Sequence, residues 1–309
     1  MEKRVLKFLL IVSVPILVLM VCICAISPSD EFRFSYIKND CSSQSLGIYK
    51  SIYRDTGKID VAFFGSSHTL MGIDDSVLNA SDKKIHVLNL GYCRFGRDLS
   101  YILFKKVLEQ KKIKTAVFEI TETEASYSHP DYAFLAGSAD IFPSSFFYNQ
   151  DFMKNRYNAF LFHTAYLREC LFGKDKRQVS YLKKYAHVSH SGTADSTYLE
   201  GQKEEKLKDL RSYDASTLAR KAELSFSAYY LNKIKELAAK NNCKVYFIYL
   251  PAYGNDVKNS LDSAFYKPYF ESLIPPDSLL TNYKNWQDEA HLTNRGAIIL
   301  SNWVLEKIN

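Results

Sequence analysis

The chain has 309 residues, of which 47% are hydrophobic and 24% are charged, the balance of a globular protein with room for one large domain. Its formal net charge of +6 comes partly from basic residues in the first seven positions and is otherwise spread along the chain. This distribution excludes a basic stripe of the kind that binds nucleic acid, so we expect no nucleic-acid partner.

An uncharged apolar run over residues 8–26 is the clearest feature of the N-terminus. It is long enough to cross a bilayer as a helix, and the basic residues before it place the N-terminus in the cytoplasm. We therefore expect residues 1–27 to be a membrane anchor, with the domain on the exocytoplasmic (periplasmic or extracellular) side of the cell membrane. The alternative is a cleaved signal peptide, with a cleavage site at residues 25–27 and a secreted domain. The length of the run favours the anchor.

Residues 28–57 are expected to form a polar juxtamembrane stretch, and residues 58–309 the main domain. In this domain, short apolar runs typical of buried strands alternate with stretches of helical periodicity. The predicted strands are residues 59–64, 85–90, 115–120, 244–250 and, as a short fifth strand, 279–282. The predicted helices are residues 74–79 (or a turn), 98–110, 218–239 and 295–308, the last capped by Thr293 or Asn294. This alternation predicts a parallel sheet in a three-layer α/β/α domain.

A segment of about residues 125–215 breaks the alternation and is rich in Tyr, Phe, Ser and Lys. We interpret it as an insertion with helical pieces, such as residues 158–171, between the third strand and the long helix. Loops at the carboxyl ends of strands build substrate sites, which makes the insertion a candidate substrate cap. The alternative is that its aromatic residues carry no special meaning, because the whole chain contains 22 Tyr and 20 Phe.

Four of the six cysteines lie after the N-terminal apolar segment: Cys41, Cys93, Cys170 and Cys243. They are widely spaced and include no Cys-x-x-Cys pair, so we predict neither a metal site nor a cofactor. Disulfides are allowed in an exported protein, but the spacing leaves the pairing open, and unpaired buried thiols are the alternative.

The first predicted strand stops abruptly in the sequence Gly65-Ser66-Ser67. Such a turn can present a serine hydroxyl at the carboxyl edge of a parallel sheet, where open α/β folds place their ligands. Glycine and serine are also common in ordinary turns, so a plain connection between a strand and a helix is the alternative.

A serine nucleophile needs a base, and the base needs a group that orients it. His291 suits the role of base, because Asp288 precedes it by three residues in a loop just before the last helix. From that distance the carboxylate can accept a hydrogen bond from the imidazole and fix its tautomer. The loops that carry Ser67 and His291 are expected to emerge at the same edge of the sheet, so the two residues can meet.

The other six histidines are weaker candidates. His86 lies inside a predicted strand, which suits a core or surface position, and His68 either caps the turn after Ser67 or lines the site. The remaining four lie in or near the insertion: His129, His163, His187 and His190. The last two suggest a metal site, but no third ligand is evident, so a solvated loop is the favoured interpretation.

Three sequence blocks, in order, resemble the SGNH (GDSL-like) hydrolase superfamily, and in particular its membrane-anchored, exported branch of DltD-like and alginate O-acetylation proteins. "FFGSSHT" resembles the nucleophile block, with Ser67 as nucleophile, and "LNLGY" the second block. "DEAHLTNRGA" resembles the last block, with Asp288 and His291 as acid and base. The resemblance implies a flavodoxin-like sheet and an oxyanion hole made by the backbone N–H groups of Ser67 and Gly91.

One block of that pattern departs from the superfamily. The asparagine expected after the third strand is replaced by the sequence "FEITETE", in which Thr121, Glu122 and Thr123 lie nearest to its position. The loss of one oxyanion donor can lower the rate roughly a hundredfold or more. Because of this departure, the sequence does not identify the third oxyanion donor.

The resemblance implies an exported O-acetyltransferase or esterase that acts on a cell-surface polysaccharide or another glycan. Its partners would be an acyl-ester donor, a glycan acceptor and a multi-spanning membrane-bound O-acyltransferase. The alternative is a catalytically weak or inactive binding or scaffold component of a machine that modifies surface polysaccharides.

Overall fold

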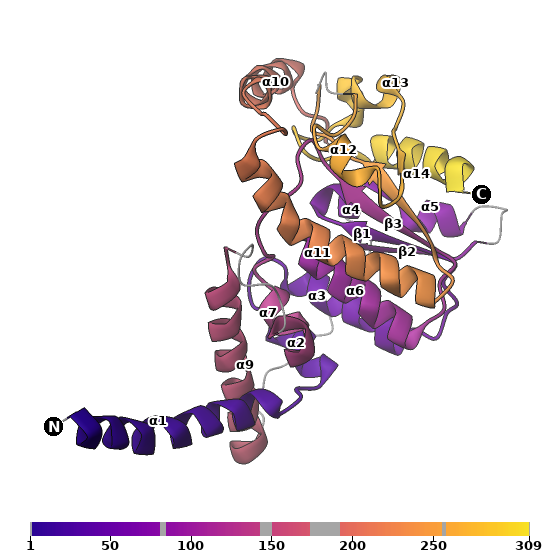
Figure 1. Ribbon diagram of the computed structural model, residues 1–309. Helices are drawn as coiled ribbons and strands as arrows, with labels where there is room; N and C mark the ends of the chain where they lie inside the picture. Colours follow the sequence, from indigo (N-terminus) through magenta and orange to yellow (C-terminus); the bar gives the residue numbers. More distant parts are fainter. Residues whose placement is uncertain (1, 81–84, 143–149, 174–191, 255–257, 309) are drawn as a thin grey trace.

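The computed structural model describes residues 2–80, 85–142, 150–173, 192–254 and 258–308 (Figure 1). Its centre is a five-stranded, all-parallel sheet with the strand order β2-β1-β3-β4-β5. The strands are β1 (Val61–Gly65), β2 (Val87–Gly91), β3 (Thr115–Ile120), β4 (Lys244–Tyr249) and β5 (Glu271–Leu273). The chain moves outward in opposite directions from β1 and β3, which makes the carboxyl ends of these two strands the switch point where such sheets place ligands.

Side chains alternate between the two faces of the sheet, and helices cover both faces. Phe64 and Phe118 belong to one hydrophobic cluster, whereas Phe63 and Val117 belong to the other. The first cluster is covered by α6 (Arg97–Gln110) and α11 (Leu218–Lys240), and the second by α4 (Ser67–Gly72), α5 (Asp75–Asn79) and α14 (Asn294–Ile308). Because both faces are buried, the strands are almost continuously apolar.

The remaining elements surround this core. They are α1 (Glu2–Ala25), α2 (Asp30–Tyr36), α3 (Ser42–Tyr49), the π-helical turn η1 (Lys50–Arg54), α7 (Tyr132–Leu135), α8 (Ser138–Ile141), α9 (Phe152–Phe172), α10 (Ser196–Arg211), α12 (Ser263–Tyr266), α13 (Asp277–Leu280) and the 3-10 turn η2 (Tyr283–Asn285). Within the expected insertion, α7 and α9 pack with α2 and α1, whereas α10 lies at the opposite end of the molecule (Figure 1).

The predicted fifth strand is wrong. Residues 277–280 form α13, and the edge strand β5 lies earlier, at residues 271–273. A Pro-Pro-Asp sequence starts α13, because proline fits the beginning of a helix and an acidic residue suits its first turn. β5 has only one buried residue among its three, so its sequence carries no apolar run.

The stretch of residues 28–57 is also not the polar segment that its sequence suggested. It forms α2, α3 and η1, and several of its apolar side chains join the first hydrophobic cluster, among them Phe34, Ile48 and Ile52. The segment therefore packs against the sheet domain.

Helix α1 extends away from the sheet and contacts α9 (Figure 1). Large apolar side chains between Phe8 and Val21 are exposed along it. Across the described residues, no single helix meets the length and apolarity expected of a membrane span. The bent pair of residues 11–25 and 30–36, with axes at 100°, meets them by length and composition.

Candidate active site

Ser67 lies at the first position of α4, immediately after β1. Ser66, in an extended conformation, is the N-cap of this helix, and its hydroxyl accepts a hydrogen bond from His68 N. The turn is tight at Gly65, where a Cβ atom would lie 2.1 Å from Thr69 Oγ1 and 2.3 Å from Glu119 Oε2. Only glycine fits between the strand and this pair of side chains.

A buried carboxylate holds the turn from below. Glu119 lies in β3 with no exposed surface. Its Oε1 accepts a hydrogen bond from Ser66 Oγ at 2.6 Å, and its Oε2 accepts bonds from Ser66 N at 2.7 Å, Thr69 Oγ1 at 2.6 Å and Thr69 N at 3.1 Å. These four bonds fix the backbone on both sides of Ser67 and leave the Ser67 side chain unconstrained by them.

Asp288 and His291 lie in a short loop closed by a bridge between Trp286 and Leu292. The Asp288 carboxylate folds back over this loop, and its Oδ1 accepts hydrogen bonds from Ala290 N at 2.9 Å and His291 N at 2.8 Å. Both of its oxygens lie 2.9 Å from His291 Nδ1. Burial alone would raise the pKa of the Asp288 carboxyl. The hydrogen bonds from His291 and Ala290 outweigh burial, so the pKa lies below its ordinary value.

The structure brings the three predicted triad residues together. His291 Nε2 lies 2.8 Å from Ser67 Oγ, although the residues are 224 positions apart. Because the Asp288 carboxylate accepts a hydrogen bond from the Nδ1–H group, the proton stays on Nδ1 and Nε2 carries the lone pair. Nε2 can therefore accept the Ser67 hydroxyl proton. This arrangement can generate a serine nucleophile.

The two predicted oxyanion donors, the backbone N–H groups of Ser67 and Gly91, differ in whether they already donate a hydrogen bond. Within the described chain, Ser67 N–H donates no hydrogen bond and stays available. The Gly91 N–H donates to Asn89 Oδ1 at 2.8 Å in this structure, so the oxyanion role of Gly91 stays a prediction that requires this bond to be exchanged. Asn89 Nδ2 also donates to three carbonyls of α4 and its end, those of Thr69, Leu70 and Ile73, so its side chain is fixed in place.

Neither the Thr121 nor the Glu122 side chain offers a free donor in place of the missing asparagine. The Thr121 hydroxyl donates to Thr123 O at 2.9 Å within its own loop. The Glu122 carboxylate accepts from Ala252 N at 2.8 Å and lies 3.2 Å from Lys206 Nζ. Burial raises the pKa of Glu122, but Lys206 and the Ala252 N–H outweigh it and lower the pKa, so this carboxylate carries no proton to donate.

His68 lines the site. Its Nδ1 donates to Leu250 O at 3.0 Å, and its ring meets that of His291 edge to face, with centroids 5.8 Å apart. Of the other histidines, His129 and His163 are fully buried and His86 is exposed. The pair at 187 and 190 lies outside the described residues.

Cys41 and Cys93 form a disulfide that joins the segment before the domain to the loop after β2. These cysteines lie close to Asp131 in an arrangement that resembles a metal site, but the disulfide removes the two thiolates that such a site would need. Of the other two cysteines whose pairing was left open, Cys243 is a buried free thiol and Cys170 is an exposed one.

Helix α10 contacts the loop that carries Asp288 and His291. Leu199 buries its side chain in the second hydrophobic cluster, Tyr198 OH donates to Glu289 Oε2 at 2.8 Å, and Tyr253 OH donates to Glu200 Oε1 at 3.0 Å. A cavity of about 230 Å³ lies between α10 and the loops that carry Ala252 and Glu289, with Lys203, Lys206 and Glu205 among its lining residues. This part of the expected insertion therefore adjoins the triad loop.

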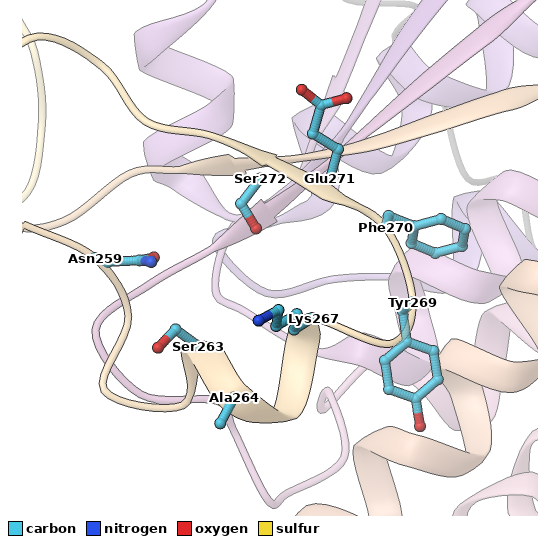
Figure 2. Close-up of a pocket in the computed structure, with 8 residues that line it drawn as sticks. All are labelled: Asn259, Ser263, Ala264, Lys267, Tyr269, Phe270, Glu271 and Ser272. Atoms are coloured by element: carbon cyan, nitrogen blue, oxygen red, sulfur yellow. The ribbon is translucent and has the colours of Figure 1, made fainter.

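A larger cavity of about 650 Å³ lies between α12 and β5, lined by residues such as Asn259, Ser263, Lys267 and Ser272 (Figure 2). Its lining contains none of the triad residues. Size alone does not make it an active site.

Sequence reasoning missed Glu119 and Asn89. Each leaves a signal: Glu119 is the single charge inside the apolar run "TAVFEI", and Asn89 is the polar residue inside "VLNLG". A buried polar residue inside a strand needs hydrogen-bond partners, and here both find them at α4.

The chain matches no protein-family model, and no curated protein matches it.

Proposed function

We propose that the protein is an exported, membrane-anchored serine enzyme of the SGNH type. It would act as an O-acetyltransferase or esterase on a cell-surface polysaccharide or another glycan. The observation that carries the proposal is the 2.8 Å contact between Ser67 Oγ and His291 Nε2, with Asp288 bound to the opposite ring nitrogen. The strand order and the place of Ser67 at the switch point agree with the flavodoxin-like sheet that this superfamily resemblance implies.

In the proposed reaction, Ser67 Oγ attacks the carbonyl carbon of an acyl ester while His291 Nε2 takes its proton. Asp288 stabilises the resulting imidazolium. The developing oxyanion accepts a hydrogen bond from Ser67 N–H. The imidazolium then gives its proton to the leaving alcohol as the ester C–O bond breaks, which leaves the acyl group on Ser67 Oγ. His291 Nε2 next takes a proton from a sugar hydroxyl or water as that oxygen attacks the acyl carbon, and returns it to Ser67 Oγ as the bond between the acyl group and Ser67 breaks.

The cavity beside α10 supports a polar acceptor. Its lining mixes cationic and anionic side chains, such as Lys203 and Glu205, with the Tyr253 ring. Such a surface offers hydrogen-bond donors and acceptors together with an aromatic ring, which suits a hydroxyl-rich ligand better than an apolar one.

Membrane anchoring is supported by the exposed apolar side chains of α1 and by the basic residues that precede them. The disulfide between Cys41 and Cys93 fits an exocytoplasmic domain, because such bonds persist in oxidising compartments. The partner that we propose for such a membrane-anchored, exocytoplasmic domain is a multi-spanning membrane-bound O-acyltransferase.

A binding or scaffold role is the second candidate, and the Gly91 N–H bond to Asn89 favours it. With that donor occupied, Ser67 N–H is the single oxyanion donor that the described residues identify. The loss of one donor lowers rates by a factor of roughly 10² to 10³, which would leave a weak enzyme.

A fluorophosphonate probe separates the two candidates. The purified full chain is treated beside Ser67→Ala and His291→Ala, with Ser43→Ala and His86→Ala as matched controls at exposed positions. We expect labelling at Ser67 in the native chain and both controls, and its loss in Ser67→Ala and His291→Ala. A folded native chain that takes up no label contradicts the catalytic proposal and favours the scaffold role.

A further inference from the structure

A third cavity, of about 250 Å³, lies far from the triad, where α1 ends and the domain begins. Ser27 and Pro28 line it directly after α1, together with Gly137 and residues of α2 and α6. Ser138 Oγ donates to Cys24 O at 2.8 Å, which ties the α7–α8 region to the last turn of α1. The cavity is therefore fixed to the base of the apolar helix.

Arg33 gives this cavity its chemical character. The residue is 4% exposed. Its Nε donates to Pro28 O at 3.2 Å, and its Nη1 donates to Phe134 O at 3.2 Å and Ala136 O at 2.6 Å. In the part of the chain that the structure describes, Nη2 makes no hydrogen bond, and Arg33 is one of the residues that line the cavity.

Three carboxylates also line the cavity, those of Asp30, Glu109 and Asp140, and the charges of Asp30 and Asp140 act on the Arg33 guanidinium. No carboxylate of the described residues lies within ion-pair distance of it. The two nearest cations already have partners, since Lys105 Nζ lies 2.8 Å from Asp140 Oδ2 and Lys106 pairs with Asp30. A buried guanidinium whose neighbouring carboxylates lie beyond ion-pair distance can gain from an anion that contacts it directly, and the cavity that Arg33 lines is where such an anion can enter.

We propose that this cavity binds a phosphate-bearing anion through the Arg33 guanidinium, with Lys105 at its rim. Guanidinium and ammonium groups form strong, charge-assisted hydrogen bonds to phosphate oxygens. The place of the cavity at the base of α1 makes an anionic lipid headgroup one source of this group, and free phosphate is the other. The inference does not depend on the chemistry proposed for Ser67.

The test measures thermal unfolding of the full chain in a neutral detergent. The added ligands are inorganic phosphate or short-chain phosphatidylglycerol, compared with chloride at equal ionic strength. A ligand that binds the folded state raises the midpoint in a saturable way. Saturation by phosphate indicates a free anion as the source, and saturation by phosphatidylglycerol alone indicates a lipid headgroup. The absence of a saturable shift with both ligands overturns the proposal.

Variants locate the effect. Arg33→Gln removes the charge, and we expect its apparent dissociation constant to rise about tenfold or more. Because Arg33 also holds three carbonyls, two variants leave it in place: Lys105→Ala, and Gly137→Leu, which narrows the cavity at a position where a Cβ meets only Asp140 Oδ2, at 3.6 Å. We expect weaker binding in both and native binding in the exposed control Arg54→Gln. Native affinity in Arg33→Gln and Gly137→Leu refutes the site.

Discussion

Glu119→Gln tests whether the buried carboxylate under the Ser66-Ser67 turn positions the nucleophile. The substitution keeps the shape of the side chain and removes its charge. The carboxylate accepts four hydrogen bonds, two from backbone N–H groups and two from hydroxyls. A hydrogen bond to a charged group contributes about 1.5–3 kcal/mol, against about 1 kcal/mol for a neutral one.

In Glu119→Gln, four hydrogen bonds to a charged acceptor become bonds to a neutral one. The lower desolvation cost of the neutral amide offsets part of this loss. We therefore expect the free energy of unfolding to fall by roughly 2–4 kcal/mol. We also expect slower fluorophosphonate labelling of Ser67. A displacement of 1 Å in a catalytic group can lower a rate about a hundredfold. Denaturant unfolding measures the first effect, and labelling at a temperature where the variant is folded measures the second.

Two variants serve as controls for Glu119→Gln. Glu306→Gln changes an exposed carboxylate of α14 and should leave both readouts unchanged. Ser67→Ala should abolish labelling with a stability change within about 0.5 kcal/mol, because its side chain takes no part in the Glu119 bonds. The reasoning is refuted if Glu119→Gln unfolds at the native denaturant concentration and labels at the native rate.

Three further substitutions probe the fold around the site. Gly65→Ala should lower both stability and labelling, because its Cβ would lie 2.1 Å from Thr69 Oγ1; native unfolding and labelling would contradict the tight turn. Cys41→Ser removes the disulfide to Cys93, which spans 52 residues. We expect the free energy of unfolding to fall by about 4 kcal/mol relative to the oxidised native chain. An unchanged free energy of unfolding would mean that the disulfide does not form. Burial raises the pKa of Asp98 from 3.8 to about 7, so folding favours its protonated form, and the native chain should lose stability relative to Asp98→Asn as the pH rises from about 4 to about 7. Parallel stability curves for the two chains over that range would show that Asp98 titrates normally.

Four of the five strands could be predicted from the sequence to within two residues of their observed ends. Each is a short apolar run bounded by turn residues, and burial on both faces makes that pattern strong. The β3 prediction, residues 115–120, agrees with the structure at both ends. β5 could not be found in the same way, because an exposed edge strand of three residues leaves no apolar run.

The sequence did not reveal that residues 28–57 supply side chains to the hydrophobic core, and the reason differs from that for β5. Polar residues such as Ser45 and Gln44 alternate with its apolar ones, and they are buried as well. The Ser45 hydroxyl donates to Phe34 O, and Gln44 Nε2 donates to Gly91 O. Polar groups that are satisfied by backbone carbonyls across the fold look in the sequence like a solvated segment.

The triad itself could be anticipated because each member follows a strand or precedes a helix in a recognisable loop. The oxyanion donors could not, because they depend on which backbone N–H group already has a partner. Gly91 occupies the expected block, but the Asn89 side chain reaches back to its N–H. A hydrogen bond between residues two positions apart is set by a side-chain torsion, and the sequence pattern does not encode it.

The hydrogen bonds around α4 leave the Ser67 N–H free, as the proposed catalytic role requires. Ser66 N and Thr69 N donate to Glu119, and His68 N donates to Ser66 Oγ. At the other end of the helix, Asn89 binds the free carbonyls. In the described residues, the amide of this turn left without a partner is that of Ser67, whose hydroxyl meets His291. A turn selected for stability alone would gain from satisfying that donor as well, whereas a turn that binds an oxyanion must leave it open.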